Sequence, residues 1–146
     1  MQTNKSLGDL ETEVTPTPFI TVPLNCQEDS LLGTVDLEKN TVSGLTVFEP
    51  GLLANAHQGI LYVDDINLLD EELVHILLNV LADGFVLVER EGLSVRYPCK
   101  PLLLASYNPT EGELREHLLD RIAMSVPAVD ITSVEERVHV VENATT

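Results

Sequence analysis

Residues 59–69 read GILYVDDINLL, and this stretch decides the fold because four apolar residues lead directly into Asp64 and Asp65. Such a run is typical of a parallel strand buried on both faces, and open α/β sheets bind ligands at the C-terminal ends of such strands. The layout is that of a Walker B element, in which Asp64 would hold a nucleotide's Mg²⁺ through water and Asp65 would orient or activate the attacking water. The alternative is a core strand followed by a helix N-cap with extra acid in its first turn.

The 146 residues contain no phosphate-binding loop of the form G-x-x-x-x-G-K-[ST], since none of the eight glycines is followed by lysine. Such a loop cradles nucleotide phosphates with its backbone N–H groups and its lysine. We therefore expect the chain not to bind ATP tightly by itself. It is either a fragment that lacks the first strand and loop, or a subunit that takes part in a site without owning one.

Composition indicates one domain, or part of one, with an aliphatic core, because 44% of the residues are apolar and only 4% aromatic. The formal charge of −16 argues against a nucleic-acid partner, which needs clustered Lys and Arg. Cys26 and Cys99 lie far apart in dissimilar contexts, which favours reduced thiols over a disulfide framework. No apolar stretch approaches the roughly 18 residues of a membrane span, and the polar, acidic N-terminus is unlike a signal peptide.

Apolar periodicity and turn residues predict the secondary structure around the acidic pair. Asp70 can cap a helix with an apolar stripe that ends at Gly84. The further elements expected are a flexible acidic lead-in over 1–17, a short strand over 19–24, a β-hairpin over 85–97, a short helix over 113–120, a final strand over 122–126 and an amphipathic helix opened by a capping box at 132–135.

A second apolar run, residues 101–107, ends on Asn108 and Pro109. If the two apolar runs are neighbouring parallel strands, Asn108 lies beside Asp64, and its amide can hydrogen-bond the attacking water or the γ-phosphate as a sensor residue does. The alternative is that Asn-Pro simply initiates a turn.

Arg121 follows the short helix predicted over 113–120. An arginine at a helix end that faces a neighbouring subunit can reach that neighbour's γ-phosphate as an arginine finger. The alternative is a surface salt bridge to Asp120 or Glu116.

The segments EPGLLA, VDDINLLD, EREG, YNPTEGELR and LLDR follow one another in the order and spacing of the AAA+ region of magnesium chelatase subunits, and residues 18 to about 141 resemble that region closely. The segments YPCKPLLLASYNPTEG and EHLLDRIA resemble those of the large D-type subunit more than those of the I-type subunit. The resemblance implies an α/β fold, a partial AAA+ core with parallel central strands, an insertion on the second helix over 34–48 and the hairpin before sensor 1. Domain bounds are then 1–17 lead-in, 18–141 partial AAA+ domain and 142–146 disordered end.

By this resemblance Asp64 and Asp65 occupy the Walker B pair, Asn108 sensor 1 and Arg121 the arginine-finger position. Asp65 stands where the family often has Glu, and its shorter reach fits weak or absent ATPase activity. Magnesium chelatase inserts Mg²⁺ into protoporphyrin IX in chlorophyll and bacteriochlorophyll biosynthesis at the cost of ATP. ATP and Mg²⁺ are therefore implied for the complex, with Asp64 a ligand to the nucleotide's Mg²⁺ only if a phosphate loop is supplied.

The partners implied are an I-type AAA+ subunit in a hetero-oligomeric ring and, indirectly, the porphyrin-binding H subunit, in a chloroplast stroma or a bacterial cytoplasm. On this interpretation the chain scaffolds the I-type ring, donates Arg121 in trans and is not catalytic alone. Two alternatives stay open: a noncatalytic interaction module or decayed fragment, and a slice of a MoxR-like AAA+ ATPase.

Overall fold

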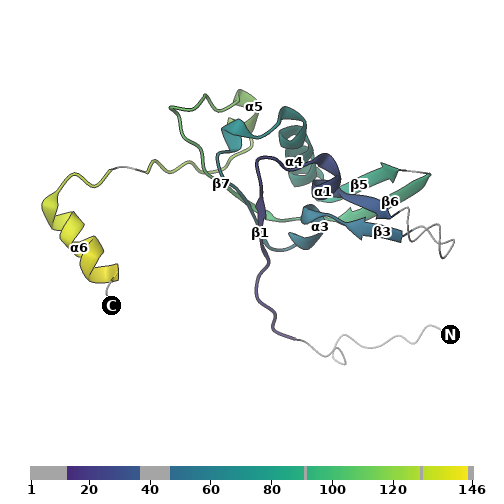
Figure 1. Cartoon of the computed structure of the whole chain (residues 1–146), viewed down its shortest axis with the longest axis horizontal. Coiled ribbons are helices and arrows are strands. Elements are labelled where there is room, and N and C mark those ends of the chain that lie inside the picture. The colour runs from purple at the N-terminus through teal and green to yellow at the C-terminus, as the bar shows by residue number, and fades with distance from the viewer. Residues whose placement is uncertain (1–12, 37–46, 91, 129, 145–146) are drawn as a thin grey trace.

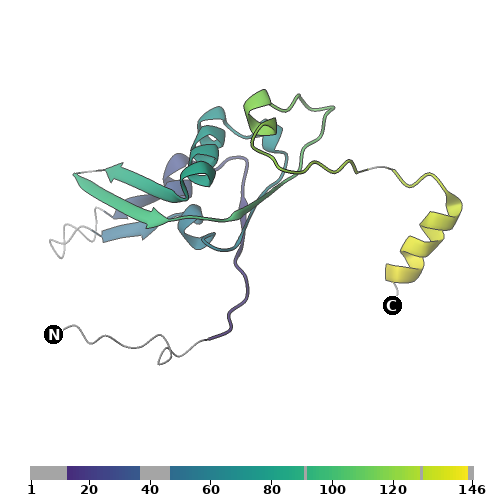
Figure 2. The same cartoon turned by 180° about the vertical axis from the view of Figure 1, so that it is seen from behind.

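The computed structural model describes residues 13–36, 47–90, 92–128 and 130–144. Its elements, in chain order, are β1 (Phe19–Val22), α1 (Glu28–Leu32), β2 (Gly33–Asp36), β3 (Val47–Pro50), α3 (Leu52–Asn55), β4 (Ile60–Val63), the 3₁₀ turn η2 (Ile66–Leu68), α4 (Glu71–Asp83), β5 (Phe85–Arg90), β6 (Leu93–Pro98), β7 (Leu102–Ala105), α5 (Glu116–Leu119) and α6 (Val134–Ala144). Figures 1 and 2 show α1, α4 and the β5–β6 hairpin gathered on one side of the strands β1 and β7.

The central sheet has the strand order β1-β4-β7, and both pairings are parallel. The register places Phe19, Ile60 and Leu102 in one row across the sheet. The α/β fold with a parallel central sheet, predicted from the two apolar runs, is therefore confirmed. β4 is the middle strand of the three, so the acidic pair that follows it lies between the ends of β1 and β7.

Helix α4 forms where the sequence predicts it. The Asp70 side chain accepts the Glu72 N–H at 2.9 Å, and Gly84 ends the helix in the left-handed region at φ 75°. Leu73, Val74 and Leu77 point into the core. His75 is exposed; its ring lies edge-on to that of His117, and its Nε2 lies 3.9 Å from a carboxylate oxygen of Glu71.

Two antiparallel pairs flank the sheet. The predicted hairpin is present as β5 and β6, which pair from Phe85 and Pro98 to Arg90 and Leu93, and β2 pairs with β3. Arg90, at the end of β5, forms ion pairs with Glu28 and Asp29 in the first turn of α1. The Tyr97 hydroxyl donates to the Leu32 carbonyl at 2.5 Å. These contacts hold the hairpin against α1.

The two faces of the central sheet differ in burial. On β4, Leu61 and Val63 are completely buried against a core built from α1, α3, α4 and the hairpin. On the other face, Leu102 is 66% exposed and Leu104 is 50% exposed, while Phe19 on β1 is also exposed. The expectation that both strands are buried on both faces is wrong for this chain, because helices of the described part pack against one face alone.

Three further expectations need correction. Residues 122–126 are not a strand, because within the described ranges no strand pairs with them through backbone hydrogen bonds. The helix expected over 113–120 is confined to α5. Residues 142–144, expected in a disordered end, form the last turn of α6, whose N-terminus is capped by the Ser133 hydroxyl accepting the Glu136 N–H at 3.1 Å.

Helix α6 lies apart from the sheet and buries none of its residues (Figure 1). Across the described ranges, no helix has both the length and the apolar character needed to cross a bilayer. Residues 1–12, most of the expected lead-in, and residues 37–46, the middle of the expected helix insertion, lie outside the described residues.

Candidate nucleotide-hydrolysis site

The ends of β4 and β7 bring two polar segments together. Val63 pairs with Ala105 in the parallel register, so the residues that follow, Asp64 and Ser106, leave the sheet side by side. The Ser106 N–H donates to the Val63 carbonyl at 3.0 Å. The adjacency of the two polar strand ends, predicted from the sequence, is confirmed.

Asp64 is exposed, and two hydroxyl groups hold its carboxylate. Both Ser106 and Tyr62 donate to Oδ1, the Tyr62 bond measuring 3.0 Å. The hydrogen bond from Ser106, followed by that from Tyr62, lowers the pKa of Asp64 below its ordinary value. The carboxylate is therefore ionised near neutral pH, as a ligand for a cation or its water shell must be.

Asp65 has an unusual backbone conformation. Its φ of 51° and ψ of 55° lie in the left-handed region, which few residues other than glycine and Asn or Asp adopt. The Asp65 N–H donates to the Ser106 Oγ at 3.2 Å, and the next N–H, from Ile66, donates to the Ser106 carbonyl at 2.9 Å. The chain thus turns sharply after Asp64, and the Asp65 carboxylate is half-buried at this turn.

Asn108 lies on the loop after β7, but its amide is engaged within that loop. Oδ1 accepts the Thr110 N–H at 3.1 Å and the Thr110 hydroxyl at 2.8 Å, and Nδ2 donates to Glu111 at 3.4 Å. This is the turn-initiating arrangement that the sequence left open as an alternative. The side chains of Asn108 and Asp64 form no hydrogen bond with each other in the described structure.

Arg121 is exposed, one residue beyond the C-cap of α5. Its backbone N–H donates to the Leu118 carbonyl at 3.0 Å. Within the described part of the chain its guanidinium forms no salt bridge, so neither Asp120 nor Glu116 pairs with it. In these ranges no hydrogen bond or ion pair joins its side chain to Asp64, Asp65 or Asn108.

Sequence analysis missed three residues that build the site. Ser106 and Tyr62 hold Asp64, and the Asn67 Nδ2 donates to the carbonyls of Asn108 and Gly112, each at 3.4 Å, which joins the turn after β4 to the loop after β7. The period of two along a strand puts Tyr62 on the same side as Asp64 and was a usable signal. Ser106, the first polar residue after a run of apolar ones, was another.

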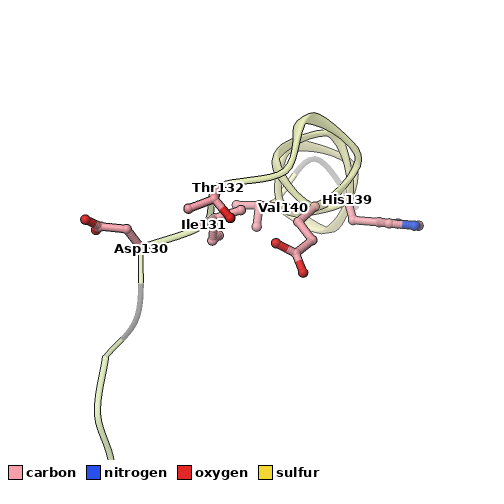
Figure 3. Close-up of a pocket in the computed structure, with 6 residues that line it drawn as sticks. Asp130, Ile131, Thr132, His139 and Val140 are labelled. Carbon is pink, nitrogen blue, oxygen red and sulfur yellow. The ribbon is translucent and has the colours of Figure 1, made fainter.

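Figure 3 shows a hollow between residues 130–132 and helix α6, where Ile131 and Val140 face each other. None of Asp64, Asp65, Asn108 and Arg121 lines it. The candidate site is therefore defined by the strand ends.

The side-chain oxygens at the strand ends provide only part of a Mg²⁺ coordination shell. Magnesium prefers oxygen ligands and usually keeps several waters, with one or two carboxylates and substrate phosphates completing its shell. Asp64 supplies an ionised, exposed carboxylate of this kind. In the described ranges no group of three or more His, Cys, Asp or Glu side chains is placed to hold a metal. The residues fit a nucleotide-bound Mg²⁺ that brings its own phosphate ligands, and Asp64 would hold it.

Comparison with known proteins assigns the chain to a family. The family described as magnesium chelatase, subunit ChlI, matches residues 37–123, more than half of the chain, including β4, β7 and Arg121. The chain belongs to this family. The partial AAA+ core predicted from the sequence agrees with this assignment.

Two magnesium chelatase subunits are similar to this chain over almost its whole length. The chain is 48% identical over 135 residues to the magnesium-chelatase 38 kDa subunit of Chlorobaculum parvum, an alignment that covers 92% of the chain and 39% of the relative. It is 50% identical over 136 residues to the magnesium-chelatase subunit ChlI of Trieres chinensis, covering 93% of the chain and 38% of the relative. The chain thus spans about two-fifths of the length of these relatives.

A solved structure shares the fold. A cryo-EM-based structure of the complex between subunits BchI and BchD of magnesium chelatase contains a chain that is 45% identical, with a TM-score of 0.73 over 88% of this chain and 40% of that one.

The expected D-type assignment is wrong. The family model is that of subunit ChlI, and the Trieres chinensis relative is named ChlI, so the chain is of the I type. The expected partner, an I-type subunit, is wrong for the same reason. The D-like residues over 97–112 did not separate the two types, since they lie within the part of the chain that the ChlI family model matches.

Proposed function

We propose that this chain is the Walker B and sensor 1 portion of the I-type AAA+ subunit of magnesium chelatase. It would support ATP-driven insertion of Mg²⁺ into protoporphyrin IX in chlorophyll or bacteriochlorophyll biosynthesis. One observation carries the proposal: at the C-terminal ends of adjacent parallel strands, the Asp64 carboxylate accepts hydrogen bonds from Ser106 and Tyr62. Open α/β sheets place nucleotide chemistry at such an edge.

Each predicted site residue has a role in this proposal. Asp64 holds the water shell of the nucleotide's Mg²⁺, and Asp65, at the turn, orients the attacking water. Asn108 serves as sensor 1 after its amide leaves Thr110. Bound Mg²⁺ would neutralise charge on the transferring phosphoryl group. The phosphate-binding loop must come from outside these 146 residues, so nucleotide affinity belongs to the assembled protein.

The proposed partner is a D-type subunit, in keeping with the BchI–BchD complex that contains a similar chain. Arg121 would act there as an arginine finger toward a nucleotide held by the neighbour, since its exposed guanidinium has no ion pair in the described chain. The relatives come from organisms such as Chlorobaculum parvum and Trieres chinensis. We infer a bacterial cytoplasm or a chloroplast stroma as the compartment.

A noncatalytic interaction module is the second candidate. Two observations favour it: the chain contains no G-x-x-x-x-G-K-[ST] motif, and the Asn108 amide is engaged in its own turn. In that case the chain would bind a D-type subunit without changing nucleotide turnover.

The test is to add the chain to a purified D-type subunit and measure ATP hydrolysis and binding between the two. We expect the chain to raise hydrolysis and Arg121→Ala to remove that increase, since an arginine finger supplies about 10³-fold or more in rate. Arg96→Ala is the matched control, because Arg96 is an exposed arginine on the hairpin that stacks over Phe85. Binding without a rate increase would leave the interaction module as the function.

A further inference from the structure

Ser106 occupies a fixed place between the two strand ends. Its N–H donates to the Val63 carbonyl at 3.0 Å, and its own carbonyl accepts the Ile66 N–H at 2.9 Å. The backbone of Ser106 is therefore anchored on both sides of the turn that carries Asp64 and Asp65.

The Ser106 hydroxyl has a defined donor and acceptor. A hydroxyl has one hydrogen to donate and oxygen lone pairs to accept. Ionised Asp64 can only accept, so Ser106 donates to its Oδ1, and the Ser106 oxygen accepts the Asp65 N–H at 3.2 Å. One side chain thus orients the carboxylate of the first acid and the backbone of the second.

The two hydroxyl donors leave the Asp64 carboxylate with a preferred orientation. Both Ser106 and Tyr62 bond to Oδ1, and a hydrogen bond from the Asp65 backbone N–H also favours the ionised carboxylate. Rotation of the carboxylate away from this orientation would break two hydrogen bonds at once, and a half-turn that exchanges its two equivalent oxygens restores the same arrangement. The second oxygen, on an exposed side chain, is therefore left without a hydroxyl donor among the described residues.

We propose that Ser106 is a positioning residue of the hydrolysis site, which fixes the Asp64 carboxylate with its second oxygen toward the cation and sets the turn that places Asp65. This inference rests on the proposed function, because it assigns the oriented oxygen to a nucleotide's Mg²⁺. Tyr62 assists as the second donor. Hydrogen-bonded neighbours of a metal ligand orient it in the same way in other sites, and their removal costs about 10-fold to 100-fold in metal affinity or activity.

The test uses the full 146-residue chain, labelled with ¹⁵N, and MnCl₂ alone as the probe. Mn²⁺ takes the same carboxylate and water ligands as Mg²⁺ and broadens NMR signals of nearby nuclei through its unpaired electrons. Because a single carboxylate without nucleotide phosphates binds a cation weakly, we expect Mn²⁺ to broaden the amide signals of Asp64 and Asp65 in the wild type at high MnCl₂ concentration. Ser106→Ala should need about tenfold more Mn²⁺ for the same broadening, and Ser106→Thr, which keeps the hydroxyl, should restore the wild-type response.

Two variants make the result specific. Ser94→Ala removes an exposed serine on β6 and should leave the broadening unchanged. If Ser106→Ala fails to fold, Tyr62→Phe removes the other donor and should show a smaller loss in the same direction.

The outcomes separate this inference from the proposed function. Equal broadening in wild type and Asp64→Asn would refute the role of Asp64 toward the cation, and the inference with it. Loss of broadening in Asp64→Asn, together with a wild-type response in Ser106→Ala, would refute the positioning role alone. A loss in Ser106→Ala that Ser106→Thr does not restore would also refute it, since the hydroxyl would then not be the active group.

Discussion

The two faces of the central sheet present the same kinds of residue to different surroundings. On the covered face, Leu61 and Val63 of β4 lie in a core shared with α1, α3 and α4. On the open face, Leu102 and Leu104 of β7 are 66% and 50% exposed. Apolar side chains therefore line both faces, but helices of the described chain protect only one.

This difference also bears on the candidate site. Side chains alternate along a strand, so Tyr62 lies on the open face. The centroid of its ring lies 5.9 Å from that of the Phe19 ring, and its hydroxyl donates to the Asp64 carboxylate. Packing on the covered face holds β4 in place. On the open face, the Tyr62 hydroxyl donates a hydrogen bond to the Asp64 carboxylate. We infer that the stability of this chain resides in the covered face and that its proposed chemistry resides at the end of the open one.

The largest effect that we predict is on the covered face. Leu61→Ala should lower the free energy of unfolding by about 2–5 kcal/mol, because it leaves a cavity in a close-packed core. Leu104→Ala, on the open face, should cost below about 1 kcal/mol. Urea unfolding followed by circular dichroism measures both values. Equal losses in the two variants would mean that the open face is as well packed as the covered one, contrary to the structure.

The two cysteines provide a second comparison, between a thiol in the core and a thiol near the surface. Cys99 is completely buried and its thiol lies 3.1 Å from the Leu53 carbonyl, whereas Cys26 is half-buried. Burial raises the pKa of Cys99 to about 11 and also raises the pKa of Cys26. Because the thiolate is the reactive form and needs access to the reagent, iodoacetamide at pH 8 should modify Cys26 first, and Cys99 only when the core opens.

Mass spectrometry of the peptides over time measures this order, with Cys26→Ser as the control in which early labelling disappears. Leu61→Ala should accelerate labelling of Cys99 more than labelling of Cys26, because it weakens the core around Cys99. Labelling of Cys99 as fast as Cys26 in the wild type would contradict the burial of that thiol.

Local sequence signals predicted much of the fold correctly. The helix between Asp70 and Gly84, the hairpin around Gly92 and the parallel pairing of β4 with β7 all depend on caps, turns and apolar runs that act over a few residues. One prediction that failed, burial of both faces, needs a second layer that composition cannot reveal. A continuous apolar run indicates that a strand can be covered on both sides; it does not show that this chain covers it.

The candidate site was predicted less completely for a related reason. Asp64 and Asn108 were identified because they end apolar runs, and their strands are indeed neighbours. The partners of Asp64 depend on register, which the sequence did not fix: Ser106 reaches the carboxylate only because Val63 lies opposite Ala105. The Asn108 amide can hydrogen-bond Thr110 within its own turn or serve as sensor 1. The Asn-Pro motif is the same in both cases, so the sequence does not separate them.

The smallest effect that we predict is the pH dependence of the open-face site. The hydrogen bonds from Ser106 and Tyr62 lower the pKa of Asp64 below its ordinary value of 3.8. A carboxyl whose pKa is lower in the folded state stabilises the fold above its unfolded pKa, and this contribution is lost as the pH falls through the lower, folded value. Titration of the Asp64 carboxyl carbon by NMR should therefore give a midpoint below 3.8, and Tyr62→Phe should move the midpoint upward by removing one donor. Ser94→Ala should leave it unchanged. A midpoint that stays the same in Tyr62→Phe would mean that the tyrosine hydroxyl does not hold the carboxylate in solution, and the open face would then contribute nothing to the site.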